Sequence, residues 1–183
     1  MAGVPSDCPG FAVSRRLAGQ RAQRLGAVWE AQVRCDLSEA VDAGLLGGFH
    51  QTGPLIQRTG PGGRKLVIIE ETAPVDFDCW SDGGAWRFEA KATSSSRWPL
   101  SQLEAHQSQQ LTTWHRPHLS RWAGVALRFH SAEPVEVWLS WDVLAPLWVD
   151  WARGRAARGM ASLTAARAIE LGRLWSPEVF LCE

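Results

Sequence analysis

The fold is decided by residues 75–93, whose sequence is VDFDCWSDGGAWRFEAKAT. Residues 75–80 alternate apolar and polar side chains, which predicts a β-strand. Residues 81–84, Ser-Asp-Gly-Gly, are typical of a tight hairpin turn, and residues 85–92 predict the returning strand. Apolar side chains of that strand share one face, so the charged ones share the other. The charged face carries Arg87, Glu89 and Lys91.

This hairpin is expected to place Asp76 on one strand beside Glu89 on the next. Two carboxylates that lie close together repel each other, so the pair favours a bound divalent cation. Oxygen ligands with open water positions suit Mg²⁺ or Mn²⁺. Lys91, one of two lysines beside 17 arginines, can orient a water or stabilise charge on a phosphate. The alternative interpretation is a surface ion pair on an exposed strand.

The rest of the chain predicts an α/β fold with a mixed central sheet flanked by helices. Apolar residues recur at three- and four-residue spacings over residues 15–44, which predicts a long helix. We expect strands at residues 66–69, 122–129 and 134–139, a helix capped by Ser101 that runs to about Trp114, a helix from Ser140 to about 150, a last helix over 163–174, and a short tail strand.

The length of 183 residues and the hydrophobic content of 45% predict a single domain with a buried core. Residues 1–14 contain several Gly and Pro residues and predict a flexible arm, whereas residues 53–65 predict a flexible basic loop. The chain has no apolar run that would span a bilayer, no apolar leader and no paired cysteine motif. We therefore expect a cytoplasmic protein without membrane contact, disulfide framework or structural zinc.

The net charge is zero, but the charges are unevenly distributed along the chain. Five arginines lie between residues 15 and 34 and five between 153 and 173, whereas acids concentrate between 70 and 89. Basic flanks around an acidic centre suit a protein that holds phosphates and cleaves one with a divalent cation, although solvated helix faces give the same pattern. Candidate DNA contacts are Arg24, Arg58, Arg64 and Lys65, and Glu30 on the first helix is a candidate further carboxylate.

Several motifs keep a common order over roughly residues 24–175. The central one is Phe88-Glu89-Ala90-Lys91-x-Thr93, followed by Trp98-Pro99-Leu100 and His106-Gln107. The others are Gly26-Ala27-Val28-Trp29-Glu30, Pro54-Leu55-Ile56-Gln57, Val75-Asp76-Phe77, and Leu147-Trp148 to Gly154-Arg155. Together they resemble the signature of the RecU-type Holliday-junction resolvases, which belong to the PD-(D/E)xK nuclease superfamily. The chain departs from that family at Cys79, where a small Gly is usual, and in a shortened, glycine-rich stalk at Gly60–Gly63.

The resemblance implies a restriction-endonuclease-like core and a role for each matching residue. Asp76 and Glu89 would bind Mg²⁺ with the help of the carbonyl of Ala90, and Mn²⁺ would substitute for it. Lys91 would be the catalytic lysine and Glu30 an additional carboxylate. Further roles at the site fall to Gln107 (a contact to the metal-site water or to DNA), Thr93 (support of the site or a phosphate contact) and Trp98 (base stacking or packing).

The resemblance also implies a function. Family members act as homodimers that make two symmetric nicks in a four-way DNA junction during recombination and repair, without an organic cofactor. Two alternatives remain open for this chain. It is a nuclease of the same superfamily that acts on other branched or linear DNA, or it binds junctions without cleaving them.

Overall fold

The computed structural model describes residues 9–52, 57–59, 65–67, 75–154 and 161–181. The helices are α1 (Pro9–Asp42), α2 (Ala105–Trp114), α3 (Trp141–Ala152) and α4 (Ala165–Leu171). The strands are β1 (Gly48–Gln51), β2 (Gln57–Thr59), β3 (Lys65–Val67), β4 (Phe77–Ser81), β5 (Gly84–Thr93), β6 (Arg97–Pro99), β7 (Arg121–Phe129), β8 (Val135–Ser140), β9 (Ser162–Thr164) and β10 (Arg173–Leu174). Short 3-10 turns are η2 (Leu100–Gln102), η3 (Pro117–Leu119) and η4 (Pro177–Leu181).

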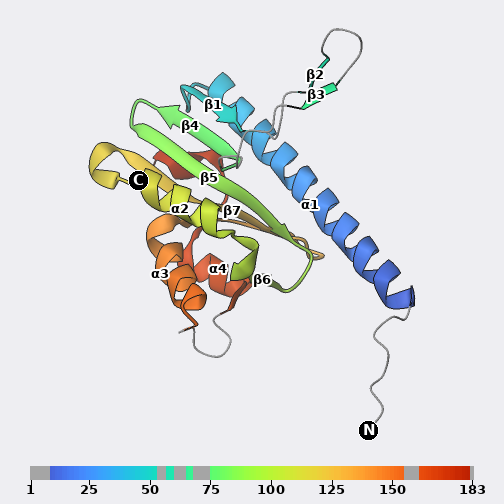
Figure 1. The fold of residues 1–183 in the computed structure, drawn as a ribbon. Helices are drawn as coiled ribbons and strands as arrows, with labels where there is room; N and C mark the ends of the chain where they lie inside the picture. The colour runs from blue at the N-terminus through green and yellow to red at the C-terminus, as the bar shows by residue number, and fades with distance from the viewer. Residues whose placement is uncertain (1–8, 53–56, 60–64, 68–74, 155–160, 182–183) are drawn as a thin grey trace.

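A six-stranded mixed sheet forms the centre of the molecule, with the strand order β1-β4-β5-β7-β8-β10 (Figure 1). Strands β5 and β7 pair in parallel, and the other neighbours in this sheet are antiparallel. Two small ribbons, β2-β3 and β6-β9, lie outside it. The predicted α/β class with a mixed central sheet is therefore confirmed.

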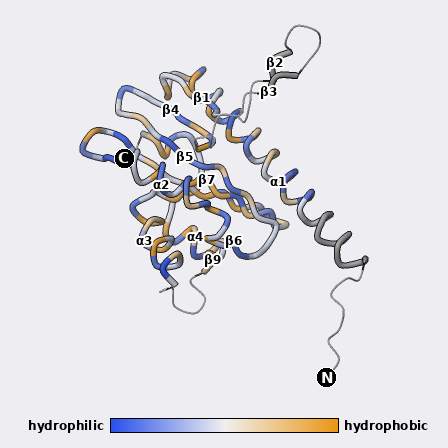
Figure 2. The backbone as a smooth tube through the Cα atoms, in the orientation of Figure 1, coloured by the Kyte–Doolittle hydropathy of each residue, from blue (hydrophilic) through white to orange (hydrophobic). Residues whose placement is uncertain are grey.

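The sheet is covered on both faces, and each face has its own hydrophobic core. On one face α1 and η4 pack against the sheet through buried aromatic residues that include Trp29, Phe88 and Phe180. On the other face α2, α3 and α4 pack against β7 and β8 through residues such as Leu111, Val125 and Leu144. Figure 2 shows hydrophobic stretches along the central strands between these layers. Most tryptophans belong to the two cores, as expected for large aromatic rings.

The β4-β5 hairpin has the register that the sequence predicts. Ser81 pairs with Gly84, so Asp82 and Gly83 form a two-residue turn, which is the commonest hairpin connection. A Cβ atom at Gly84 would clash with the carbonyl group of Ser120, so this position favours glycine. The turn fixes which residues of β4 and β5 face each other, and the candidate site depends on that register.

Three other boundaries differ from the sequence-based prediction. Helix α1 begins at Pro9, so residues 9–14 of the expected arm are helical, and residues 1–8 lie outside the described residues. Helix α2 begins at Ala105 rather than near Ser101, because the 3-10 turn η2 precedes it. The expected tail strand is instead η4, while the short strand β10 lies just before it.

The expected basic loop at residues 53–65 is only partly described. Within it β2 and β3 pair as an antiparallel ribbon, with Gln57 opposite Val67 and Thr59 opposite Lys65. Residues 53–56 and 60–64 lie outside the described residues, as do positions 68 and 69 of the predicted strand. Across the described part of the chain, no helix combines the length and apolar character needed to cross a membrane.

Candidate active site

Asp76 and Glu89 meet at the base of the β4-β5 hairpin. Phe77 pairs with Phe88, so continuing the antiparallel register by one residue brings Asp76 opposite Glu89. The backbone N–H of Ala90 donates a hydrogen bond of 2.8 Å to Oδ2 of Asp76. This bond fixes one carboxylate beside the strand that carries the other, as the sequence predicted.

Glu89 is fully buried, and its two carboxylate oxygens have different surroundings. Oε2 lies 2.8 Å from Nζ of Lys91 and accepts a 2.8 Å hydrogen bond from Nε2 of Gln107. Oε1 is buried and has no hydrogen-bond partner among the described residues. A buried carboxylate oxygen without a donor is costly, so its presence requires an explanation.

The pKa of Glu89 is raised to about 8, mainly by burial and also by the nearby carboxylate of Asp76, whereas the ammonium group of Lys91 acts in the opposite direction. Desolvation and a like charge both disfavour the ionised form of a carboxyl group. Near neutral pH the carboxyl group of Glu89 therefore holds a proton, unless another positive charge takes the place of that proton.

Glu30 reaches the same site from helix α1. Its pKa is raised by burial and by the carboxylate of Asp76, and it is lowered by Lys91. These interactions place Glu30 within electrostatic reach of both residues, although it is far from them in sequence. The preceding residue, Trp29, is buried and donates a 2.9 Å hydrogen bond from Nε1 to the carbonyl oxygen of Ala126, which anchors this turn of α1 against β7.

Gln107 is held by the first turn of α2. The side chain of Glu104 caps the helix, and Oε1 of Gln107 accepts a 3.0 Å hydrogen bond from the backbone N–H of Glu104. This reciprocal arrangement is a capping box. Because the amide oxygen is used in the cap, the amide nitrogen of Gln107 is directed at Glu89. The structure thus brings together all five predicted catalytic residues: Glu30, Asp76, Glu89, Lys91 and Gln107.

Sequence reasoning missed two residues that shape this site. Oε1 of Gln110 accepts a 3.0 Å hydrogen bond from the backbone N–H of Val75, which ties α2 to the residue before Asp76. Glu104 fixes the orientation of Gln107. The spacing Glu104-x-x-Gln107 resembles a capping box with an acidic cap, and this signal was available in the sequence. No local pattern indicated Gln110.

The site has some of the features that a divalent cation needs. Among the described residues, no three His, Cys, Asp or Glu side chains lie close enough to hold a metal ion by themselves. Asp76 and Glu89 nevertheless form a carboxylate pair in which Oε1 of Glu89 has no donor. Two carboxylates, a backbone carbonyl and water are a suitable donor set for Mg²⁺, which keeps several waters when it binds to proteins. The residues present therefore fit this ion.

The predicted DNA contacts are not gathered at the site. Arg24 is exposed on α1, and the N-terminal part of this helix extends beyond the sheet (Figure 1). Arg58 lies on β2 and Lys65 on β3, where only the backbone is described, and Arg64 lies outside the described residues. Their contact with DNA remains a prediction.

The structure corrects the role of Trp98. Its side chain is fully buried, because β6 pairs with β9 and places Trp98 opposite Leu163 inside the second core. It therefore packs rather than stacks on a base. Thr93 is also buried, and its hydroxyl group donates to the carbonyl of Arg97 and accepts from the N–H of Ser95. Of the two expected roles of Thr93, this geometry supports the structural one.

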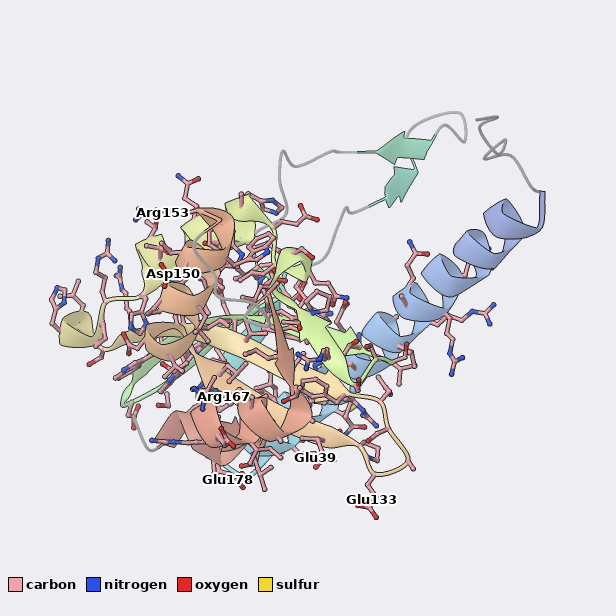
Figure 3. All side chains as sticks on the ribbon, turned by 90° about the horizontal axis from the view of Figure 1, so that it is seen from below. Glu39, Glu133, Asp150, Arg153, Arg167 and Glu178 are labelled. Carbon is pink, nitrogen blue, oxygen red and sulfur yellow. The ribbon has the colours of Figure 1, made fainter. Side chains whose placement is uncertain are left out.

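A separate hollow of about 460 Å³ lies where the C-terminal part of α1 approaches η4. Four carboxylates line it: Asp36, Glu39, Glu136 and Glu178. Figure 3 labels two of them, Glu39 and Glu178. A hollow with this charge repels phosphate groups and lies apart from the carboxylate pair of the hairpin, so it is a poor candidate for binding DNA.

Comparisons with known proteins show a likeness in structure. The chain matches no protein-family model, and a search of the curated proteins finds no match. Among solved structures it is similar to the Holliday junction resolvase Hjc of the archaeal hyperthermophile Archaeoglobus fulgidus, with a TM-score of 0.47 and 19% sequence identity. The likeness covers 85% of this chain and 99% of that chain. At this level of similarity the RecU-type resemblance remains a prediction.

Proposed function

We propose that this chain is a Mg²⁺-dependent endodeoxyribonuclease that cleaves branched DNA. One observation carries the proposal. A buried carboxylate, Glu89, is held by Lys91 and Gln107 through one oxygen, while its other oxygen has no donor among the described residues. Asp76 lies within electrostatic reach of Glu89, and Glu30 lies within electrostatic reach of Asp76 and Lys91. A surface ion pair on an exposed strand would not be buried, nor would it have a second carboxylate, Asp76, within electrostatic reach.

Asp76 and Glu89 would hold the metal ion, together with the carbonyl of Ala90, and Mn²⁺ would substitute for Mg²⁺. When bound, such an ion polarises the phosphate and acidifies water. It would also balance the like charges of the carboxylate pair, which explains why an unpaired oxygen is tolerated in a buried position.

The protein's own groups have distinct roles around that centre. Lys91 places a compact positive charge beside Glu89, where it can stabilise negative charge that develops on the phosphate. Gln107 holds the orientation of the Glu89 carboxylate. Glu30 has a raised pKa, and a carboxylate with a pKa closer to neutrality is better suited to accept a proton from water. No organic cofactor is needed for this chemistry.

The four-way junction is proposed as the substrate because of the order of motifs that the chain shares with RecU-type resolvases. Such a substrate has two-fold symmetry, and a homodimer would place two copies of the site on its opposed strands. A nuclease that prefers other branched or linear DNA is the second candidate, which the shortened stalk at Gly60–Gly63 favours. A protein that binds junctions without cleaving them would have no need for the carboxylate pair.

The decisive experiment compares Asp76→Asn and Glu89→Gln with the parent chain on a synthetic four-way junction in Mg²⁺. Each substitution removes a metal ligand, so cleavage should fall by about two orders of magnitude or more. The control is Glu133→Gln, which removes an exposed carboxylate from the turn after β7 (Figure 3) and should cleave like the parent. Undiminished cleavage by either site variant would refute the assignment.

The same gels distinguish the substrates. Two symmetric nicks in the junction, with little cleavage of linear duplex, would support junction resolution by a dimer. Light scattering should then give about twice the 20.2 kDa mass of one chain. Equal cleavage of duplex and junction would instead favour the second candidate.

A further inference from the structure

A polar groove lies beside the candidate active site. Its volume is about 440 Å³, and its walls come from one face of α2 and from the beginnings of β5 and β7. The lining residues are Arg87, His106, Gln109, Gln110, Thr113, Trp114 and Arg121. None of them carries a negative charge, in contrast to the acidic hollow near η4.

Two arginines of this groove share one aromatic ring. The guanidinium carbon of Arg87 lies 4.1 Å from the ring centroid of Trp114, and that of Arg121 lies 5.1 Å from it. Cation–π attraction holds each guanidinium at the ring, but two like charges brought this close also repel each other. The arrangement therefore favours a neutralising anion.

Only one of these two charges is neutralised within the described residues. Arg87 makes a bidentate ion pair with Asp78, with distances of 2.6 and 2.8 Å. Arg121 is exposed, and the described residues offer its guanidinium group no carboxylate partner. The carbonyl groups at the end of α2 do not compensate the charge of Arg121. Arg116 already donates hydrogen bonds to two of them, the carbonyl oxygens of Thr112 and His115. One uncompensated positive charge therefore remains at the groove.

The cluster continues the face that carries the candidate active site. Arg87 precedes Glu89 by two residues on the same face of β5, and Asp78 follows Asp76 by two residues on β4. Arg121 pairs with Ala85, which precedes Glu89 by four residues on β5. A strand advances about 3.3 Å per residue, so Arg121 lies about 13 Å from Glu89 along the sheet. That distance is close to four nucleotide rises of about 3.4 Å in one strand of B-form DNA. A DNA strand with its scissile phosphate at Glu89 can therefore place a phosphate a few nucleotides away in the groove.

We propose that the groove formed by Arg87, Trp114 and Arg121 binds a backbone phosphate of the DNA strand, a few nucleotides from the scissile phosphate. Arg121 contacts the phosphate directly. Trp114 is a positioning residue that holds both guanidinium groups in place. The inference rests on the proposed nuclease function, and it assigns to this surface the DNA contact that Trp98 does not make.

The test measures DNA binding without cleavage, by fluorescence anisotropy of a labelled four-way junction in EDTA over a series of salt concentrations. Arg121→Gln should weaken binding about tenfold at low salt and lower the slope of log Kd against log salt concentration by about one, because one phosphate contact is lost. The control is Arg167→Gln on α4, which removes the same charge from an exposed ion pair with Glu170 and should bind like the parent (Figure 3).

Two variants of Trp114 test its positioning role. Nε1 of Trp114 has no hydrogen-bond partner in the described part of the chain, so Trp114→Phe keeps a ring without losing a bond and should bind close to the parent. Trp114→Leu removes the ring face and should approach the affinity and salt slope of Arg121→Gln, with thermal unfolding checking that it is folded. Equal binding by the Leu and Phe variants would overturn the role of the ring.

The outcomes separate this inference from the proposed function. If the parent cleaves DNA but Arg121→Gln keeps both its affinity and its salt slope, the groove is not a phosphate site and the nuclease assignment stands. If the parent does not cleave DNA but Arg121→Gln loses one unit of salt slope relative to it, the phosphate site stands and the nuclease assignment fails. Absence of any DNA binding by the parent would overturn both.

Discussion

At the scale of single residues, Glu89 is the most informative side chain. It is buried, it lies opposite a second carboxylate, and it interacts with Lys91 and Gln107 through only one of its oxygens. Such an arrangement does not stabilise the fold, because the free energy needed to desolvate a carboxylate exceeds the free energy that one ion pair contributes. A residue that costs stability in this way indicates a functional site.

The raised pKa of Glu89 leads to a prediction about metal binding. Near pH 7 the carboxyl group of Glu89 holds a proton in the metal-free protein, since its pKa is about 8. A metal ion requires the ionised form, so binding should release about one proton. We expect Mn²⁺ affinity to rise with pH from about 6 to 8 and to level off above that range.

Calorimetry at pH 7 in two buffers of different ionisation enthalpy measures this proton release. The observed binding enthalpy should differ between the buffers by the amount expected for about one proton. Glu89→Gln should show neither the binding nor the buffer dependence. Binding with the same enthalpy in both buffers would mean that the proton is absent and that Glu89 is already ionised.

At the scale of elements, α2 contacts the hairpin at three points and holds it in place. Gln107 at its first turn contacts Glu89, Gln110 binds the backbone before Asp76, and Trp114 at its last turn lies against Arg87. One helical face therefore touches three successive points of the charged face of the sheet. Residues at spacings of three and four share a helical face, which is why a single short helix can do this.

Two substitutions separate the capping role of this helix from its role at the site. Glu104→Ala removes the cap but leaves Gln107 in contact with Glu89, so it should lower stability by about 1 kcal/mol and spare cleavage. Gln107→Leu removes the reciprocal hydrogen bond of the capping box and the contact with Glu89, so it should cost similar stability and also reduce kcat about tenfold or more. Chemical unfolding and single-turnover cleavage measure the two effects. Equal kcat values for the two variants would show that Gln107 acts only in the cap.

The hairpin could be predicted from sequence because its determinants are local. Alternation of apolar and polar residues defines the strands, and Asp82-Gly83 sets the register that brings Asp76 opposite Glu89. The start of α1 was misjudged because Pro9 was interpreted as a breaker, although proline is well suited to the first turn of a helix. The sequence could not decide between stacking and packing for Trp98, because its burial depends on pairing with Leu163, which is 65 residues away.

The cluster of Arg87, Trp114 and Arg121 could not be predicted from the sequence either, because it depends on contacts between distant elements. Its members come from β5, α2 and β7, and they meet only because α2 packs against the parallel pair of strands. The sequence indicated the charged face of β5 but not which ring or second arginine would join it. Glu30 stood out in the sequence as an acid among arginines, but no local pattern relates α1 to the hairpin, so its place at the site could not be derived from spacing.

At the scale of the whole molecule, the site lies where elements from both layers reach the same strands. The C-terminal half of helix α1 is fixed by Trp29, which donates to the carbonyl of Ala126, and by Asp36, which accepts a 2.8 Å hydrogen bond from Nε1 of Trp175. These bonds keep the helix against the first core and hold Glu30 near the hairpin. The two cores thus position the carboxylates from opposite sides of the sheet.

The free energy of unfolding of the whole chain should therefore depend on the ionisation of Glu89. Since the pKa of Glu89 is raised in the folded state, the folded chain keeps a proton between about pH 4.5 and pH 8 that the unfolded chain has released. The free energy of unfolding should fall as the pH rises through this window. Burial of Glu30 acts in the same direction. Glu89→Gln removes the main contribution, so it should be more stable than the parent at pH 9, by an amount on the order of a few kcal/mol.

Urea unfolding in EDTA at intervals from pH 4.5 to pH 9 measures this difference. The curves of Glu89→Gln and the parent should diverge as the pH rises, whereas Glu133→Gln should follow the parent throughout, because its carboxylate is exposed. Added Mn²⁺ should stabilise the parent at pH 8 and leave Glu89→Gln unchanged, since an ion that binds only the folded state raises its stability. A constant separation between the two curves across the pH range would show that the pKa of Glu89 is the same in the folded and unfolded chains. The charge of Glu89 beside Asp76 would then not destabilise the folded chain.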